Sequence, residues 1–262
     1  MGGLNCAVKD HNAGSGQCAT RFLLCILPVT VLCTMPKIPE QGIFMTVSSA
    51  SFNEAGILAY NDGNYAEAFK QFDAAARTAD PAGQHLLASL YYQGHGVTQD
   101  LPKAVELFTA AAQAGFPPSL ANLALMYASG DGVAQDMAQS LAYGRQAAEA
   151  GDGQSQFNLA QAYRKGIDVP QDYAEAAFWY KQAAEAGSLS AQNEYGLLYA
   201  QGQGVELDYV QAYAWIAMPA EAGSVQSIKN RDQLLEILTP SQQQAARTLA
   251  AEYAEQYGVN PH

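Results

Sequence analysis

The sequence predicts an all-α protein, a solenoid of helix-turn-helix repeats, and three observations predict it. A ten-residue stretch with constant tyrosine, glycine and aspartate recurs every 36 residues, at 91–100, 127–136, 163–172 and 199–208. Another glycine follows an alanine-rich segment with the same period, at Gly115, Gly151, Gly187 and Gly223. Apolar residues between these markers are spaced three and four apart, as on a helix with one buried face. Such a fixed period is typical of units that bury their apolar faces against each other.

The glycine after each tyrosine is expected to end the first helix of its unit, because a residue with positive φ closes the last turn most easily without a Cβ. These residues are Gly94, Gly130, Gly166 and Gly202. Two residues later the loop must reverse, and three units have glycine there: Gly96, Gly132 and Gly204. The third unit has Asp168, a residue type that tolerates the left-handed conformation. Each unit should therefore be two helices joined by one tight loop.

The aspartate that ends each stretch is the expected N-cap of the second helix. These caps are Asp100, Asp136, Asp172 and Asp208. Three units also have a glutamine or glutamate three residues later, at Gln139, Glu175 and Gln211, a spacing that predicts capping boxes.

The markers also set the expected boundaries of the domain. Four repeats should occupy 82–115, 116–151, 152–187 and 188–223, after an N-terminal hairpin at 51–81. Two helices parted by Thr239 and Pro240 should follow over 224–258 and cover the last apolar face, as a solenoid requires.

The pattern as a whole resembles the Sel-one-like repeat, a relative of the tetratricopeptide repeat. Its features are a leucine-rich first helix, Tyr-x-x-Gly-x-Gly-Val-x-x-Asp, Lys-Ala or Glu-Ala, an aromatic residue, and a closing Ala-Ala and Gly. The resemblance covers Pro81 to Gly223 and implies a right-handed α/α superhelix, with Asp168 as a mild departure. Residues 56–81 are similar to a tetratricopeptide unit itself.

Residues 1–50 differ from the rest and are expected to be a leader. All four cysteines lie there, at Cys6, Cys18, Cys25 and Cys33, so the repeats contain no disulfide framework. The apolar run from Arg21 to Met35 is too short for a membrane span but suits a signal-peptide core. Two interpretations stay open: a periplasmic or secreted protein, or a cytoplasmic one whose translation starts at Met45.

Composition and motifs exclude several classes of function. Lys and Arg number 13 against 25 Asp and Glu, a formal net charge of −12 that would repel nucleic acid. No nucleophile, metal or phosphate-binding motif stands out, so we expect no enzyme, no metal and no cofactor. His95 has no counterpart in the other units and is expected to be a solvated loop residue, whereas Trp179 and Trp215 share one repeat position and should be core residues.

The leading hypothesis is a monomeric scaffold that binds a peptide or helix of a partner protein in a concave groove lined by first helices. Candidate contacts lie on those helices outside the apolar stripe: Tyr92, Asn122, Leu125, Phe157, Asn158, Gln161, Arg164, Lys165, Asn193 and Leu197. The amides of Asn122 and Asn158, one unit apart, could bond a peptide backbone, and Arg164 with Lys165 could hold a carboxylate.

Two alternatives stay open. One is a structural adaptor of an envelope assembly that uses its convex face or its ends. The more remote one is a hydrolase of β-lactams or peptidoglycan, because disulfide-rich members of the resembled family have been associated with cell-wall compounds. The paired cysteines of those members are absent from the repeats of this chain.

Overall fold

The computed structural model describes residues 48–257, and in that range it contains helices and no strand. The helices are α1 (Ser49–Asn61), α2 (Tyr65–Ala76), α3 (Pro81–Gln93), α4 (Leu101–Gln113), α5 (Pro117–Ser129), α6 (Met137–Glu149), α7 (Gly153–Lys165), α8 (Tyr173–Glu185), α9 (Leu189–Gln201), α10 (Tyr209–Glu221), α11 (Val225–Ile237) and α12 (Pro240–Tyr257). The predicted fold class, an all-α solenoid of helix-turn-helix units, is confirmed. The leader predicted for residues 1–50 lies, up to residue 47, outside the described residues.

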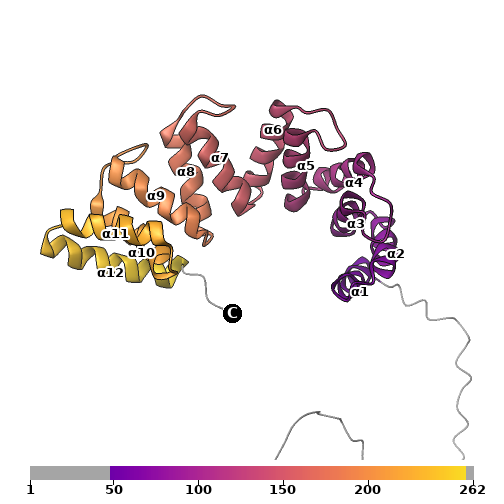
Figure 1. The fold of residues 1–262 in the computed structure, drawn as a ribbon, viewed down its shortest axis with the longest axis horizontal. Helices are drawn as coiled ribbons and strands as arrows, with labels where there is room; N and C mark the ends of the chain where they lie inside the picture. The colour runs from indigo at the N-terminus through magenta and orange to yellow at the C-terminus, as the bar shows by residue number, and fades with distance from the viewer. Residues whose placement is uncertain (1–47, 258–262) are drawn as a thin grey trace, which may run out of the picture. The chain divides into compact units, whose positions relative to one another are not determined.

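Consecutive helices pair as hairpins, and each hairpin packs on the next in chain order (Figure 1). The last two helices, α11 and α12, both pack against α10. There Leu234, Leu238, Ala246 and Ala250 join the core around Ile216. The apolar face of the last hairpin is therefore covered. Within residues 48–257 no helix is both long and apolar enough to cross a membrane.

The loop between the two helices of each unit has the predicted geometry. Gly94, Gly130, Gly166 and Gly202 cap the first helices in the left-handed conformation, with φ between 63° and 84°. The reversing residues have φ from 70° to 72° at the glycines and 61° at Asp168. Both predictions for the loop are confirmed.

The four aspartates cap the second helices as predicted, but the capping boxes are wrong. Each carboxylate accepts a bond from the backbone N–H three residues later, at 2.9–3.1 Å. The N–H of the aspartate itself, which a capping box would give to Gln139, Glu175 or Gln211, instead donates to the tyrosine carbonyl nine residues earlier at 2.9–3.1 Å. The loop is thus closed across its base, and in three units the side chain of Gln99, Gln135 or Gln171 adds a bond to a backbone carbonyl seven residues earlier, at 2.7–2.8 Å.

Each loop also packs on the preceding unit, and for this reason His95 does not have the environment that the sequence predicted. At Gly96 an added Cβ would lie 2.3 Å from the backbone oxygen of Tyr65, the first residue of α2. Beside this contact the His95 ring stacks on Tyr65 with centroids 4.3 Å apart, and its Nδ1 lies 3.2 Å from the Tyr60 hydroxyl. The prediction of a solvated loop histidine is therefore wrong.

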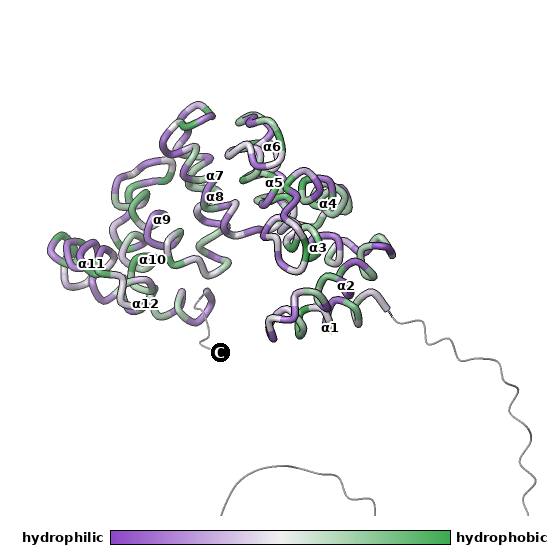
Figure 2. Tube along the Cα trace, turned by 45° about the vertical axis from the view of Figure 1, so that its right-hand side comes forward, coloured by the Kyte–Doolittle hydropathy of each residue, from purple (hydrophilic) through white to green (hydrophobic). Residues whose placement is uncertain are grey.

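The core combines large apolar residues of the first helices, such as Leu123 and Leu198, with alanines and a few large side chains of the second helices. Trp179 and Trp215 are buried, as predicted. Figure 2 shows apolar and polar residues interleaved along the helices, as expected where one face of each helix is buried. The buried residues form four clusters that divide within α3, α6 and α10; in α6, Ala147 belongs to the cluster of α3–α6 and Ala148 to that of α6–α10.

Candidate functional site

Cavities lie between successive first helices of the solenoid, and we call the surface that contains them the first-helix face. The α1–α3 cavity is lined by Ile57, Tyr60, Phe72, Leu86, Ser89, Leu90 and Gln93. The α3–α5 cavity is lined by Ser89, Tyr92, Gln93, Phe108, Asn122, Leu125 and Met126. These two cavities share Ser89 and Gln93, and the next one, between α5 and α7, shares Leu125. The three form a continuous row.

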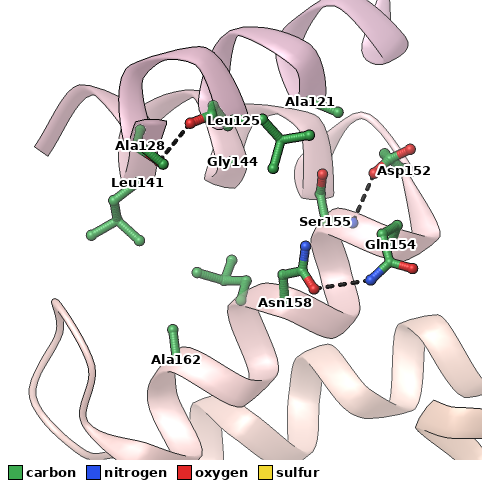
Figure 3. Close-up of a pocket in the computed structure, with 13 residues that line it drawn as sticks. Ala121, Leu125, Ala128, Leu141, Gly144, Asp152, Gln154, Ser155, Asn158 and Ala162 are labelled. Carbon is green, nitrogen blue, oxygen red and sulfur yellow. Dashed lines mark hydrogen bonds between the residues drawn. The ribbon is translucent and has the colours of Figure 1, made fainter. Parts of the chain in front are cut away.

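The α5–α7 cavity has a volume of about 260 Å³. Figure 3 shows it between three helices, with Leu125 of α5, Leu141 and Gly144 of α6, and Asn158 and Ala162 of α7 around it. An enclosed apolar cavity of about 150 Å³ is already large enough to bind benzene. The α5–α7 cavity therefore has room for a ring or a branched apolar group.

The cavity has a clear cause in the repeat. The central core position of the second helix, read every 36 residues, is Phe72, Phe108, Gly144, Tyr180 and Ile216. The four large side chains are at most 2% exposed. Gly144 contributes nothing, and a Cβ added there would meet only the Cβ of Ala124, at 3.9 Å. The space that a core side chain fills in every other unit is open in this one.

The opposite wall of the α5–α7 cavity also has a smaller side chain than the other units have. Ala162 of α7 occupies the repeat position of Leu90, Met126 and Leu198, all of which are buried. A glycine inside a helix costs about 0.5–1 kcal/mol relative to alanine, and an emptied core position costs several kcal/mol in other proteins. Local rules that are broken at a cost in stability are expected at functional sites.

The loop of the third unit departs from the pattern at this junction too. An added Cβ at Gly132 would lie 2.5 Å from the backbone of Leu101, and at Gly204 1.9 Å from the carbonyl oxygen of Tyr173. Asp168 has a Cβ, so its loop cannot approach the equivalent residue, Met137, as closely. Met137 is accordingly 42% exposed. At the junction between the second and third repeats, the loop thus lacks the reversing glycine and the core lacks a large side chain.

The structure places most of the predicted contact residues at these cavities. Seven of the ten line a cavity. Two of these cavities are further ones, which lie between α7, α9 and α11 and between α9 and α11. The seven residues are Tyr92, Asn122, Leu125, Phe157, Asn158, Asn193 and Leu197. The other three make contacts of their own. Gln161 accepts a hydrogen bond from Lys165 at 3.1 Å, and Arg164 pairs with Glu194 at 3.7 Å, so a carboxylate of the chain itself already faces that guanidinium.

Some of the polar groups at the α5–α7 cavity already form hydrogen bonds within the protein. Gln154 donates to the Asn158 Oδ1 at 2.9 Å, and the Ser155 N–H donates to Asp152 at 2.7 Å (Figure 3). The Asn158 amide nitrogen has no partner within residues 48–257 and is free to donate. Burial and the nearby Asp131 carboxylate raise the pKa of Tyr92 at the neighbouring α3–α5 cavity, so its hydroxyl stays protonated and donates to Asp131 at 3.3 Å.

Sequence reasoning missed the most distinctive residues of this site, Gly144 and Ala162. Their signal was present, because both break a column of large apolar residues that the repeat otherwise keeps. The described residues contain no group of histidine, cysteine and carboxylate side chains suited to a metal ion.

Comparisons with known proteins agree with this architecture. The Sel1 repeat profile matches residues 81–116, 117–152, 153–188 and 189–224. A Sel1 repeat protein from Oxalobacter formigenes is 34% identical in a solved structure with a TM-score of 0.63, over 65% of this chain and 49% of that one. An antigen of uropathogenic Escherichia coli with an SLR fold is 27% identical with a TM-score of 0.41, over 80% of this chain and 62% of that one.

This chain thus spans about half the length of the Oxalobacter protein. No curated protein matches the chain. Sel1 repeat proteins are generally protein-interaction scaffolds. Since the four matched units make up more than half of the sequence, the chain belongs to the Sel1 repeat family.

Proposed function

We propose that this protein is a non-catalytic scaffold that binds a segment of a partner protein along its first-helix face. The observation that supports this proposal is the continuous row of cavities from α1 to α7, joined through Ser89, Gln93 and Leu125. A row of cavities at the repeat spacing suits an extended peptide or a helix that inserts one side chain after another.

Leu125 has a central place in this proposal. It lines two neighbouring cavities and is 63% exposed, so a bound segment would cover apolar surface that now faces water. Asn122 and Asn158 flank it at equivalent positions one repeat apart. Their amides can donate to and accept from a peptide backbone, which would fix the direction of the bound segment.

Selection from a displayed library of random peptides on the full chain tests this proposal. Selected peptides are then titrated, by fluorescence anisotropy, against the wild type, a Leu125→Ala variant and an Asn122→Ala, Asn158→Ala double variant. We expect each variant to weaken binding at least tenfold.

The matched control is Phe178→Ala. Phe178 is an apolar residue of α8 that is 52% exposed and lines none of the five cavities described above. This control should bind as the wild type does. Loss of binding in Phe178→Ala, with Leu125→Ala unaffected, would instead support an adaptor that uses the second-helix side.

A further inference from the structure

We propose that the α5–α7 cavity is a socket for one aromatic or branched apolar side chain of a positively charged partner segment. This inference rests on the proposed scaffold function and names what the scaffold binds and where. It is carried by the shape of the cavity, by the repeat itself and by the charges around the cavity.

The repeat indicates the kind of side chain that fits. In the other units the same space holds the chain's own Phe108, Tyr180 or Ile216. Gly144 removes that side chain, and Ala162 shortens the facing wall. On α5, Ala124 is small as in the other units, whereas Ala121 replaces the His85 or Phe157 ring that packs on the core side chain of the first and third repeats. The space that holds a buried aromatic or branched residue in the other units is thus open at this junction, so a side chain of that type from a partner can take its place.

Access and orientation also favour a peptide side chain over a free small molecule. Leu125 stands exposed at the border with the α3–α5 cavity, so a chain that enters one cavity continues into the next. The free amide nitrogen of Asn158 lies at the same rim, where it can donate to a backbone carbonyl next to the inserted residue (Figure 3). A free small molecule could fill the α5–α7 cavity but would not extend into the α3–α5 cavity.

Charge complementarity favours a basic segment. The whole chain carries a net charge of −12, and Asp152 is the charged residue among those that line the socket. Of the nearby cations, Arg164 pairs with Glu194, and Arg145, which keeps its charge, is held against the ring and hydroxyl of Tyr163. Lysine or arginine beside the inserted residue would therefore be attracted, and acidic residues repelled.

Synthetic peptides with the frame Lys-Lys-Gly-Xaa-Gly-Lys-Lys, where Xaa is Phe, Leu or Gly, test the socket when titrated against the full chain by NMR chemical shift. We expect the Phe and Leu peptides to bind at least tenfold more tightly than the Gly peptide. The same peptides with Glu in place of Lys should bind at least fivefold more weakly. Equal binding of the Phe and Gly peptides overturns the socket, and tighter binding of the Glu frame overturns the choice of a basic segment.

Variants that fill the socket from opposite walls locate it. Gly144→Phe restores the residue type of Phe108, and Ala162→Leu restores that of Leu90 and Leu198. Both should remove the preference for Phe over Gly while thermal unfolding shows an intact fold. Gln146→Phe, which adds the same side chain at an exposed position of α6, is the matched control and should keep the preference.

Three further outcomes separate this inference from the scaffold function. If the peptides selected from the displayed library bind both filled variants as they bind the wild type, the scaffold stands and the socket fails. If the library yields no binder, both fail. If analytical ultracentrifugation shows that the wild type self-associates and Gly144→Phe does not, the occupant is a second copy of this chain and the assignment to a partner segment is overturned.

Discussion

The second and third repeats have loops with the same caps but differ in the side chain at the central core position of the second helix. Both end the first helix with a left-handed glycine and begin the second with an aspartate whose N–H closes the loop. Yet the third buries Tyr180 completely, edge-on to Phe157, whereas the second has Gly144 and a cavity. Turn chemistry and core filling are therefore separable within one repeat. The recurring residues maintain the solenoid, and the residue that fails to recur leaves the cavity at which we propose that a partner binds.

The largest effect is expected when the central core side chain of the third repeat is removed as well. Tyr180→Ala should lower the free energy of unfolding by about 3–5 kcal/mol, because it removes a fully buried aromatic ring. Urea unfolding followed by circular dichroism measures the change. Tyr180→Phe keeps the ring and should stay within about 1.5 kcal/mol of the wild type, as volume-conserving exchanges do. A loss below about 1 kcal/mol for Tyr180→Ala would mean that the core column does not stabilise the units.

The next largest effect concerns the loops. Gly204→Ala should destabilise by about 2–4 kcal/mol, because its φ is +72° and the new Cβ would lie 1.9 Å from the Tyr173 carbonyl oxygen. Gly223→Ala is the matched control, since its φ is also positive but nothing lies within 4 Å of an added Cβ. It should cost only about 1–2 kcal/mol. Equal losses in the same urea assay would show that backbone strain alone, rather than contact with the preceding unit, requires glycine at position 204.

The loops show how far the sequence predicts this fold. Left-handed glycines and capping aspartates depend on residues close to them along the chain, so Gly94 or Asp136 could be placed correctly from local pattern alone. The capping boxes failed because the N–H of each aspartate is taken by a tyrosine carbonyl nine residues away. His95 failed because its environment is Tyr65 of the preceding unit. Contacts between units decide both cases, and no single repeat contains them.

The site was predictable to a similar depth. Choosing exposed positions on the first helices gave seven residues that line cavities, because helical periodicity fixes which face is outward. The cavity at Gly144 depends instead on the absence of a side chain in one column of the repeat, which is visible only when all units are compared position by position.

A smaller effect is expected when a methyl group is added at the empty core position of the second repeat. Gly144→Ala should raise the free energy of unfolding by about 0.5–1 kcal/mol, since alanine is the better helix former and its Cβ meets only Ala124 at 3.9 Å. Gly196→Ala, in the first helix of the fourth repeat, is the contrasting change. Its Cβ would lie 2.6 Å from the side chain of Ile216, so it should destabilise. If Gly144→Ala also destabilises, the cavity wall cannot accept even one methyl group.

The smallest effect is a pH dependence in the first repeat, where His85 occupies the position of Ala121 in the second and Phe157 in the third. Burial between Phe108 and Phe116 lowers the pKa of His85, whose Nδ1 lies 2.9 Å from the Ser119 hydroxyl. The unfolded chain, with a histidine pKa of about 6.5, therefore binds more protons than the folded chain just below that value. Stability contributed by His85 is present above about pH 6.5 and is lost as the pH falls toward the lower folded value.

Urea unfolding at pH 7.5 and pH 5.5 measures this dependence. His85→Phe, which installs the residue of the third repeat, should reduce the difference in unfolding free energy between the two pH values. An unchanged difference would assign it to other groups.

The cavity beside Gly144 has a consequence for how the protein unfolds. In a linear array each unit is stabilised only by its neighbours, so cooperativity passes along the chain only where adjoining units are well coupled. The buried clusters separate within α3, α6 and α10, and the division in α6, between Ala147 and Ala148, lies in the helix that carries Gly144 and lines the α5–α7 cavity. Unfolding should therefore proceed in two stages, with amide hydrogen exchange in α3–α5 and in α8–α10 reporting different opening energies, and a ligand that fills the socket would join the two stages into one.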